Sequence, residues 1–398
     1  MTAPELLAPA GNLEKLKTAL HFGADAVYLG GRAFSLRAFS ENFDEEGLKT
    51  AIGFAHAGGK KVYVTANVFA KNADFPMLSD YFAFLSEAGA DAAIVTDAGA
   101  LAVAKKSAPG LVLHLSTQAN TTNKYAAKFW QEQGVSRVVL ARELSLAEIA
   151  EIRDFCPDLE LEAFVHGAMC ISYSGRCLLS NYLDGRDSNR GECVQACRRK
   201  YFVRSEGRDE CALEEDGRGS YLLNSKDLCM IGNLAELRRA GVDSFKIEGR
   251  MKSSYYLATV VNAYRRAISG DAAGALYEEL KKCAHREYTQ AYAFGENPAT
   301  VNYQDSQQAG TRVFAANVLG YENGFALAEM RNRFREGDVL EILSPSEHFN
   351  QTFVAEEMYA ESGERVADVK LVQQRVRIRC PYPLSEGDIL RLVPHMNG

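Results

Sequence analysis

The chain has 398 residues, of which 47% are hydrophobic and 24% are charged, and its formal net charge is −7. This composition is ordinary for a folded globular protein, and the length predicts two or three domains, or one large barrel with a small second domain. The N-terminus has no basic segment followed by an apolar one, and no run of about eighteen apolar residues occurs, so neither a signal peptide nor a membrane span is predicted.

Nine cysteines in a chain without a secretion signal indicate reduced thiols rather than a disulfide framework. We therefore expect a cytoplasmic protein. The negative net charge argues mildly against nucleic acid as a partner. Charges are screened over about 8 Å, however, so a local basic patch can act apart from distant acids.

The first half of the chain repeats one unit, in which a short apolar strand is followed by a polar turn and an amphipathic helix. Eight strands are predicted, at residues 5–8, 26–29, 62–66, 92–96, 112–115, 137–140, 159–165 and 244–247. Eight such units over about 270 residues predict a (β/α)8 barrel. A doubly wound open sheet is the alternative, which the absence of a Gly-x-Gly-x-x-Gly turn disfavours.

In a barrel of this kind, reacting groups lie at the C-terminal ends of the strands. Polar residues cluster at the predicted ends, and the candidates for chemistry are Arg142, Glu162, His166, Glu248 and Arg250. The alternative is structural. An inward Glu162 would then pair with Arg142 or Lys246 inside the barrel mouth, and His166 would be an ordinary loop residue.

The eighth unit carries an insertion at about residues 167–240, which holds six of the nine cysteines: Cys170, Cys177, Cys193, Cys197, Cys211 and Cys229. It is also rich in basic and aromatic residues, among them Arg176, Arg198, Arg199, Tyr173, Tyr182, Tyr201 and Phe202. Rings that stack on bases beside guanidinium groups that meet phosphates suit a single-stranded nucleic acid. A solvated surface with a few packed tyrosines is the alternative.

Residues 273–300 are predicted to form a helical linker, and residues 301–398 a small closed β-barrel domain. Within that domain, Arg335-Glu-Gly-Asp-Val-Leu-Glu-Ile-Leu343 is similar to Ser385-Glu-Gly-Asp-Ile-Leu-Arg-Leu-Val393. The pair predicts the same turn and strand used twice.

The cysteine spacing separates the possible metal sites. The gaps of six, fifteen and thirty-five residues that separate Cys170, Cys177, Cys193 and Cys229 fit poorly to zinc knuckles, which use Cys-x-x-Cys pairs. An iron–sulfur cluster needs four converging thiolates without a fixed local turn, and it suits this spacing better. A thiol nucleophile is the rival, because Cys170 lies four residues from His166.

The stretch Glu162-Ala-Phe-Val-His-Gly-Ala-Met-Cys170-Ile-Ser-Tyr-Ser-Gly-Arg-Cys177-Leu-Leu-Ser180 resembles the signature of peptidase family U32, the collagenase-like proteins. The resemblance continues at Asn224-Ser-Lys-Asp-Leu-Cys229 and at Phe245-Lys-Ile-Glu-Gly-Arg-Met-Lys252. Although the family is named for proteolysis, several of its branches are oxygen-independent hydroxylases with a [4Fe–4S] cluster. One acts on the wobble uridine of tRNA with prephenate as oxygen source, another on a ribosomal RNA cytidine, and a third on ubiquinone precursors.

The layout of this chain is similar to the tRNA branch, because the quinone branch typically lacks the C-terminal β domain. The resemblance implies Cys170, Cys177, Cys193 and Cys229 as cluster ligands, with Cys197 as a possible substitute, and tRNA as the partner. Guanidinium groups bind carboxylates bidentately, so Arg142, Arg176 and Arg250 are expected to hold prephenate.

Glu162, His166 and Glu248 are expected to shape proton transfer, and Arg198 and Arg199 to contact RNA. A peptidase that uses Cys170, or a non-catalytic cluster-bearing subunit that docks RNA, are the alternatives. A paralogous subunit or a second copy of the chain is a further expected partner.

Overall fold

The computed structural model describes residues 3–36, 41–199, 201, 223–295, 300–302, 308 and 310–394. These residues divide into two compact units. The first comprises the described parts of 1–16, 25–251 and 286–308, and the second those of 17–24, 252–285 and 309–398. Within the described part of the chain, no helix is long and apolar enough to cross a membrane.

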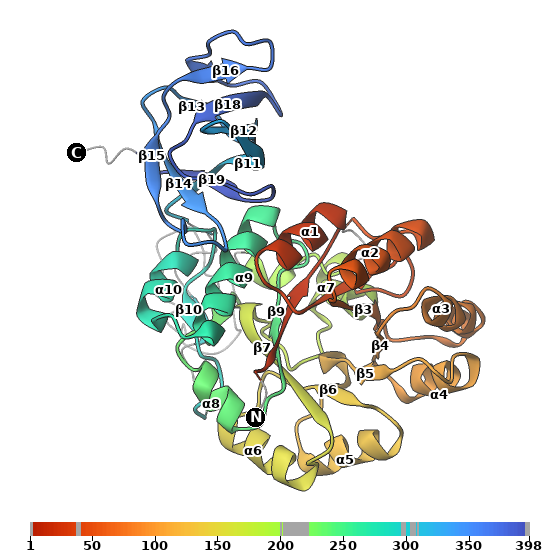
Figure 1. The fold of residues 1–398 in the computed structure, drawn as a ribbon. Coiled ribbons are helices and arrows are strands. Elements are labelled where there is room, and N and C mark those ends of the chain that lie inside the picture. The colour runs from red at the N-terminus through yellow and green to blue at the C-terminus, as the bar shows by residue number, and fades with distance from the viewer. Residues whose placement is uncertain are drawn as a thin grey trace. The chain divides into compact units, whose positions relative to one another are not determined.

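Eight parallel strands form a closed ring in the first unit, in which each strand pairs with the next and the last pairs with the first. They are β1 (Glu5–Pro9), β2 (Ala26–Gly30), β3 (Lys61–Ala66), β4 (Ala92–Val95), β5 (Leu113–Leu115), β6 (Arg137–Val139), β7 (Glu160–Ala168) and β9 (Ser244–Ile247) (Figure 1). All eight correspond to predicted strands, so the predicted barrel is confirmed and the open sheet is wrong.

Helices alternate with these strands along the chain. They are α1 (Leu13–His21), α2 (Glu45–Ala57), α3 (Phe75–Glu87), α4 (Ala98–Ser107), α5 (Lys124–Glu132), α6 (Leu146–Phe155) and α8 (Leu234–Arg239). Local capping explains where several begin. Ser145 and Glu148 form a capping box at α6, and Asp44 accepts a hydrogen bond from the Gly47 N–H at α2.

The insertion separates β7 from β9 and adds short elements of its own. These are α7 (Leu179–Asp184), two 3-10 turns (Ser188–Arg190 and Ala196–Arg198) and β8 (Asp227–Cys229). Strand β8 runs antiparallel to the end of β7, with Cys229 in register with His166, and β10 (Tyr288–Thr289) pairs with β8. The insertion therefore begins at the C-terminal end of a barrel strand. Lys200, Phe202, Arg204, Arg208 and Cys211 lie outside the described residues.

The second unit contains α9 (Ser254–Ser269), α10 (Ala273–Leu280) and an antiparallel, curled sheet. Its seven strands run in the order β15 (Thr352–Val354), β14 (Val339–Leu343), β19 (Ile389–Leu392), β11 (Val313–Glu322), β12 (Phe325–Met330), β18 (Arg375–Arg379) and β16 (Met358–Ala360). The strands β13 (Phe334–Arg335) and β17 (Asp368–Val369) form a separate pair. Among the described residues, the outermost strands β15 and β16 are not paired with each other.

The repeated Glu-Gly-Asp motif makes the same turn twice, as predicted. Asp338 accepts a hydrogen bond from the Arg335 N–H at 2.7 Å, and Asp388 accepts one from the Ser385 N–H at 2.9 Å. The intervening glycines have φ of 92° and 96°, a conformation that favours glycine. The strands that follow, β14 and β19, pair with each other.

Candidate functional site

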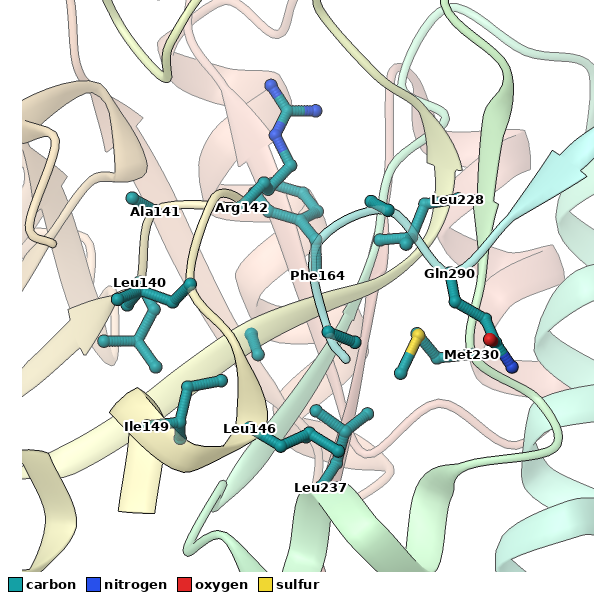
Figure 2. Close-up of a pocket in the computed structure, with 14 residues that line it drawn as sticks. Leu140, Ala141, Arg142, Leu146, Ile149, Phe164, Leu228, Met230, Leu237 and Gln290 are labelled. Carbon is teal, nitrogen blue, oxygen red and sulfur yellow. The ribbon is translucent and has the colours of Figure 1, made fainter. Parts of the chain in front are cut away.

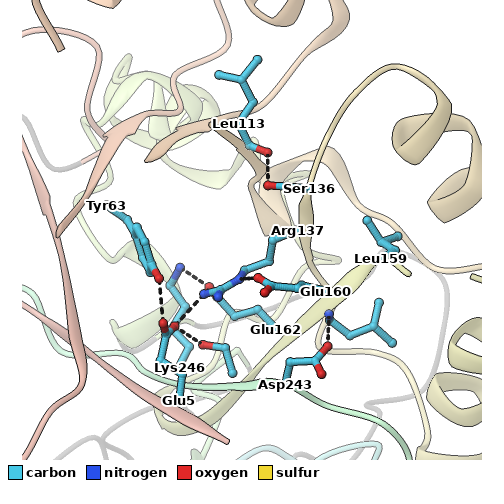
Figure 3. A network of polar contacts seen from close by, with 12 residues as sticks. Glu5, Tyr63, Leu113, Ser136, Arg137, Leu159, Glu160, Glu162, Asp243 and Lys246 are labelled. Carbon is cyan, nitrogen blue, oxygen red and sulfur yellow. Dashed lines mark hydrogen bonds and ion pairs between the residues drawn. The ribbon is translucent and has the colours of Figure 1, made fainter. Parts of the chain in front are cut away.

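A buried network of charges lies inside the barrel (Figure 3). The Glu162 carboxylate is fully buried, and it accepts hydrogen bonds from Lys246 Nζ at 2.6 Å and from Arg137 at 3.1 Å. Arg137 also contacts Glu5 at 2.6 Å and Glu160 at 2.8 Å. The network therefore joins side chains from β1, β6, β7 and β9.

The network favours the charged forms of Glu162 and Arg137. Burial alone would raise the pKa of Glu162, but Lys246 and Arg137 outweigh burial, and the net pKa is lowered. Burial alone would lower the pKa of Arg137, but Glu162 and Glu5 raise it. The observed partners favour a structural role for Glu162. Sequence reasoning named Lys246 as one possible partner but missed Arg137, whose only signal is a cation at the head of an apolar strand.

His166 and Glu248 lie where β7 and β9 end. The His166 carbonyl accepts a hydrogen bond from the Glu248 N–H at 2.8 Å, and Tyr28 Oη donates to Glu248 Oε2 at 3.2 Å. Gly167 has φ of 110°, and a Cβ there would collide with the Glu248 carbonyl. The two strands thus approach too closely for any other residue. His166 is buried, with its ring 5.3 Å from that of Tyr288; proton transfer by either residue stays a prediction.

The arginines expected to bind carboxylates are held by different segments. Arg142 donates to the Ala168 carbonyl at 2.9 Å, and its guanidinium lies 5.3 Å from the centre of the Phe164 ring. Arg176 is exposed.

Arg250 is buried and reaches across the mouth of the barrel. It donates to Ser35 Oγ at 2.6 Å and to Asn42, and a Cβ on Gly30 would occupy the space of its guanidinium. A carboxylate site shared by Arg142, Arg176 and Arg250 stays a prediction.

One cavity of about 40 Å³ lies beside Arg142 (Figure 2). Its walls are mainly aliphatic, and they include Leu140, Leu146, Leu228, Met230 and Leu237. A water molecule needs at least about 10–15 Å³ of such space. The cavity therefore has room for water molecules beside the Arg142 side chain.

The cysteine-bearing loops bring four thiols into mutual influence. Burial raises the pKa of Cys197, Arg198 opposes the shift, and Cys170, Cys193 and Cys177 raise the pKa further. Cys170 and Cys193 are exposed, Cys177 and Cys197 are half-buried, and Cys229 is buried on β8.

The thiols have the donor chemistry that an iron–sulfur cluster needs, which is a set of four thiolates. In the described part of the chain, however, no three Cys, His, Asp or Glu side chains already converge as metal ligands. The residue types therefore fit such a cluster, and the ligand set stays a prediction.

Arg198 ties the cysteine-bearing segments together. It donates to the Met169 carbonyl at 2.7 Å, to Asn224 Oδ1 at 2.9 Å and to the Ser225 carbonyl at 2.5 Å. These contacts link the segment before Cys170 to the segment that leads to Cys229. Because its guanidinium is engaged by protein oxygens, this arrangement favours a bracing role over RNA contact. Arg199 is about half exposed and contacts Asp184 at 3.0 Å.

The insertion is anchored to the barrel by Arg190, which sequence reasoning did not single out. Its guanidinium donates to both Asp74 oxygens, at 2.7 and 3.0 Å, and to the Phe69 carbonyl at 2.8 Å. Gly175 lies against the backbone of Gln118, where a Cβ would collide. The cysteine loop thus lies over the segments that follow β3 and β5.

Large apolar side chains are exposed around the cysteines. They are Ile171, Tyr173, Leu178, Tyr182 and Leu183, and Tyr182 is 82% exposed. A surface of this kind marks an interaction site more often than an inert face.

The chain is therefore an eight-stranded α/β-barrel protein that carries a thiol-bearing insertion and a C-terminal β unit. The chain matches the model of "Peptidase family U32" over residues 11–303 and that of "Peptidase family U32 C-terminal domain" over residues 311–391. The chain belongs to peptidase family U32, as its sequence resemblance predicts.

Curated relatives cover nearly the whole chain. It is 39% identical to "tRNA hydroxylation protein P1" of Bacillus subtilis, covering 98% of this chain and 94% of that protein. It is 38% identical to "tRNA hydroxylation protein P" of Escherichia coli, covering 92% and 91%. Identity to the Escherichia coli "23S rRNA 5-hydroxycytidine C2501 synthase" is 37%, covering 66% of this chain but only 39% of that protein.

Replacing Glu162 by glutamine should destabilise the barrel by about 3–5 kcal/mol, because it removes the carboxylate that pairs with the buried Lys246 and one of the three that contact Arg137. Glu160→Gln is the matched control. It removes a carboxylate from the same Arg137, but Glu160 is half exposed, so a loss within about 1 kcal/mol is expected. Trp130, the single tryptophan, lies in the barrel unit, and its fluorescence during denaturation follows the unfolding. A Glu162→Gln protein with parental stability would contradict the structural role.

Replacing Arg198 by glutamine should loosen the cysteine loops and raise several-fold the rate at which a thiol reagent labels Cys229, which is buried and follows the segment that Arg198 holds. Arg199→Gln removes the same charge from the adjacent residue but breaks only the exposed ion pair with Asp184, so labelling should stay at the parental rate. Mass spectrometry of labelled peptides gives the rate for each thiol. Equal labelling in both variants would rule out the bracing role.

Proposed function

We propose that the chain is an RNA hydroxylase that converts the wobble uridine of tRNA to 5-hydroxyuridine, with prephenate as oxygen donor and a [4Fe–4S] cluster as cofactor. The observation that carries the proposal is the similarity, over 98% of this chain, to a protein named for tRNA hydroxylation. The thiols and the exposed aromatic surface at the end of β7 support it.

The reaction balances without molecular oxygen. Replacing C5–H by C5–OH removes two electrons from the uracil ring. An alcohol donor X–OH that leaves as X–H supplies the oxygen and takes up those electrons. Prephenate carries such a hydroxyl group and two carboxylates.

The cluster would be held by Cys170, Cys177 and Cys193 with a fourth thiolate. The resemblance implies Cys229, and the electrostatic coupling of Cys197 to the other three makes Cys197 the alternative. Such a cluster supplies one-electron redox chemistry or a Lewis-acidic iron. Arg198 would hold the surrounding loops in place.

Binding of the acid falls to guanidinium groups near the barrel mouth. Arg250 is preorganised by Ser35 and Asn42, and Arg142 by Ala168. Planar guanidinium groups suit two carboxylates. Three residues are proposed for proton transfer: Glu162, His166 and Glu248. Of these, Glu162 and His166 are buried, whereas Glu248 is partly exposed and accepts a hydrogen bond from Tyr28.

RNA would approach the exposed surface around Tyr173 and Tyr182. Arg176 lies between them in the sequence, and Arg199 contacts Asp184, two residues after Tyr182. Unstacked bases of loops stack on aromatic rings, which is the usual route to sequence-specific RNA recognition. An anticodon loop presents such bases.

Two other functions are less well supported. Hydroxylation of a ribosomal RNA cytidine is suggested by one relative, but the match covers only 39% of that relative's length. Peptidase activity would need Cys170 as the nucleophile and His166 as its base, with both side chains accessible. Cys170 is exposed, but His166 is buried and so is not placed to act as that base.

Anaerobically purified protein should contain iron and sulfide, and Cys170→Ser, Cys177→Ser and Cys193→Ser should each lose most of both. Comparison of Cys197→Ser with Cys229→Ser identifies the fourth ligand, since only the ligand variant should lose iron. Cys156 ends helix α6 ahead of β7, whereas Cys170 follows β7, so Cys156→Ser is the control and should retain iron. Full iron in both Cys177→Ser and Cys229→Ser would rule out the set implied by the resemblance.

The function is tested by digesting total tRNA from a deletion strain and measuring its nucleosides by mass spectrometry. A mass loss of one oxygen at wobble uridine, restored by the intact gene but not by Cys177→Ser, is expected. Purified protein should hydroxylate a tRNA transcript only when prephenate is present. Unchanged wobble uridine together with gelatin cleavage that does not need prephenate would favour the peptidase.

A further inference from the structure

Strand β18 presents three arginines, Arg375, Arg377 and Arg379, on the exposed face of the C-terminal sheet, while Val376 and Ile378 between them are buried. The neighbouring strands are β12 and β16. The strand alternation places the three guanidinium groups in one row, roughly 7 Å apart.

The three arginines differ in their partners. Arg375 lies near Glu329 at 3.8 Å and Glu361 at 3.6 Å. The guanidinium groups of Arg377 and Arg379 instead lie 5.1 and 5.3 Å from the centre of the Phe325 ring. Across the described residues of this unit, neither of these two arginines forms an ion pair with an acid.

The Phe325 ring explains how the guanidinium groups of Arg377 and Arg379 can lie close together without an acidic partner in the described part of the chain. Phe325 on β12 is in register with Arg379 of β18, and Tyr359 on β16 is in register with Arg377 of β18. The Phe325 and Tyr359 rings are packed edge to face, with their centres 6.0 Å apart. A guanidinium group held over an aromatic face keeps its N–H donors free, and it loses less side-chain entropy when it binds.

We propose that Arg377 and Arg379, held over Phe325, form a contact surface for the phosphate backbone of the RNA substrate; this proposal rests on the proposed function. Two arginines stacked on a ring and without an acidic partner among the described residues give this face of an acidic chain a local positive charge, which would attract a negatively charged partner. A phosphodiester strand offers a regular row of charges, and phosphate pairs bidentately with guanidinium.

The neighbouring acids define the limits of the surface. Glu329 and Glu361 are taken by Arg375, and Glu322 is in register with Phe325 at the end of β11. RNA would therefore meet Arg377 and Arg379 rather than the whole row. Contacts of this kind position the RNA and read no bases.

The test uses the full-length protein and an unmodified tRNA transcript with a wobble uridine, with binding measured by fluorescence anisotropy at several salt concentrations. The variant Arg377→Gln/Arg379→Gln should bind about tenfold more weakly, and the slope of log affinity against log salt should fall by about 2, because each lost phosphate contact reduces it by about 1.

The matched control is Arg333→Gln/Arg375→Gln, which removes the same charge from arginines that are already near acids. Its affinity should stay within twofold of the parent. Phe325→Leu keeps both charges but removes the ring, so affinity should fall a few-fold with the salt slope unchanged. Circular dichroism and thermal unfolding verify that each variant folds.

Equal losses in the two double variants would overturn the proposal, because they would indicate a general charge effect. Parental RNA binding by Arg377→Gln/Arg379→Gln would also overturn it, and a changed sedimentation coefficient in that case would indicate a protein partner. These outcomes differ from failure of the proposed function. If the proposed function were wrong, the parent protein itself would not bind the transcript, and wobble uridine would be unchanged in the deletion strain.

Discussion

The structure depends on closure of the barrel by β9, which pairs with β1 on one side and β7 on the other. The chain reaches β9 only after the long insertion, so the two strands that meet there are far apart in sequence. The pair formed by Lys246 and Glu162 joins them inside the barrel. Removing two charges from water is costly, and only good geometry with further partners offsets the cost. Arg137 supplies those further contacts.

Closure also places the candidate site. Because β7 and β9 are parallel, their C-terminal ends lie at one end of the barrel, and the insertion begins there. Gly167 permits the backbone contact between His166 and Glu248. The thiols of the insertion and the polar residues of the strand ends therefore belong to the same end, as in other barrels of this architecture. The proposed chemistry needs both sets together.

The sequence predicted what depends on local pattern. Apolar runs followed by capped helices located all eight strands, and the repeated Glu-Gly-Asp turn was visible because glycine and aspartate each have one local role there. Arg137 and Arg198 could not be assigned in the same way. Their partners lie up to 132 residues away along the chain, and nothing in the sequence distinguishes an arginine that braces buried carbonyls from one that faces solvent.

The same limit affects any inference about RNA from composition. A net charge of −7 counts every arginine equally, yet Arg391 is fully buried beside Glu279 and Glu341, and Arg375 lies beside two acids. Only arginines without such partners add to the local potential that a phosphate meets, because nearby opposite charges cancel and distant ones are screened. An acidic chain can therefore bind RNA through a few well-placed cations, and its affinity should depend on their contacts rather than on its total charge.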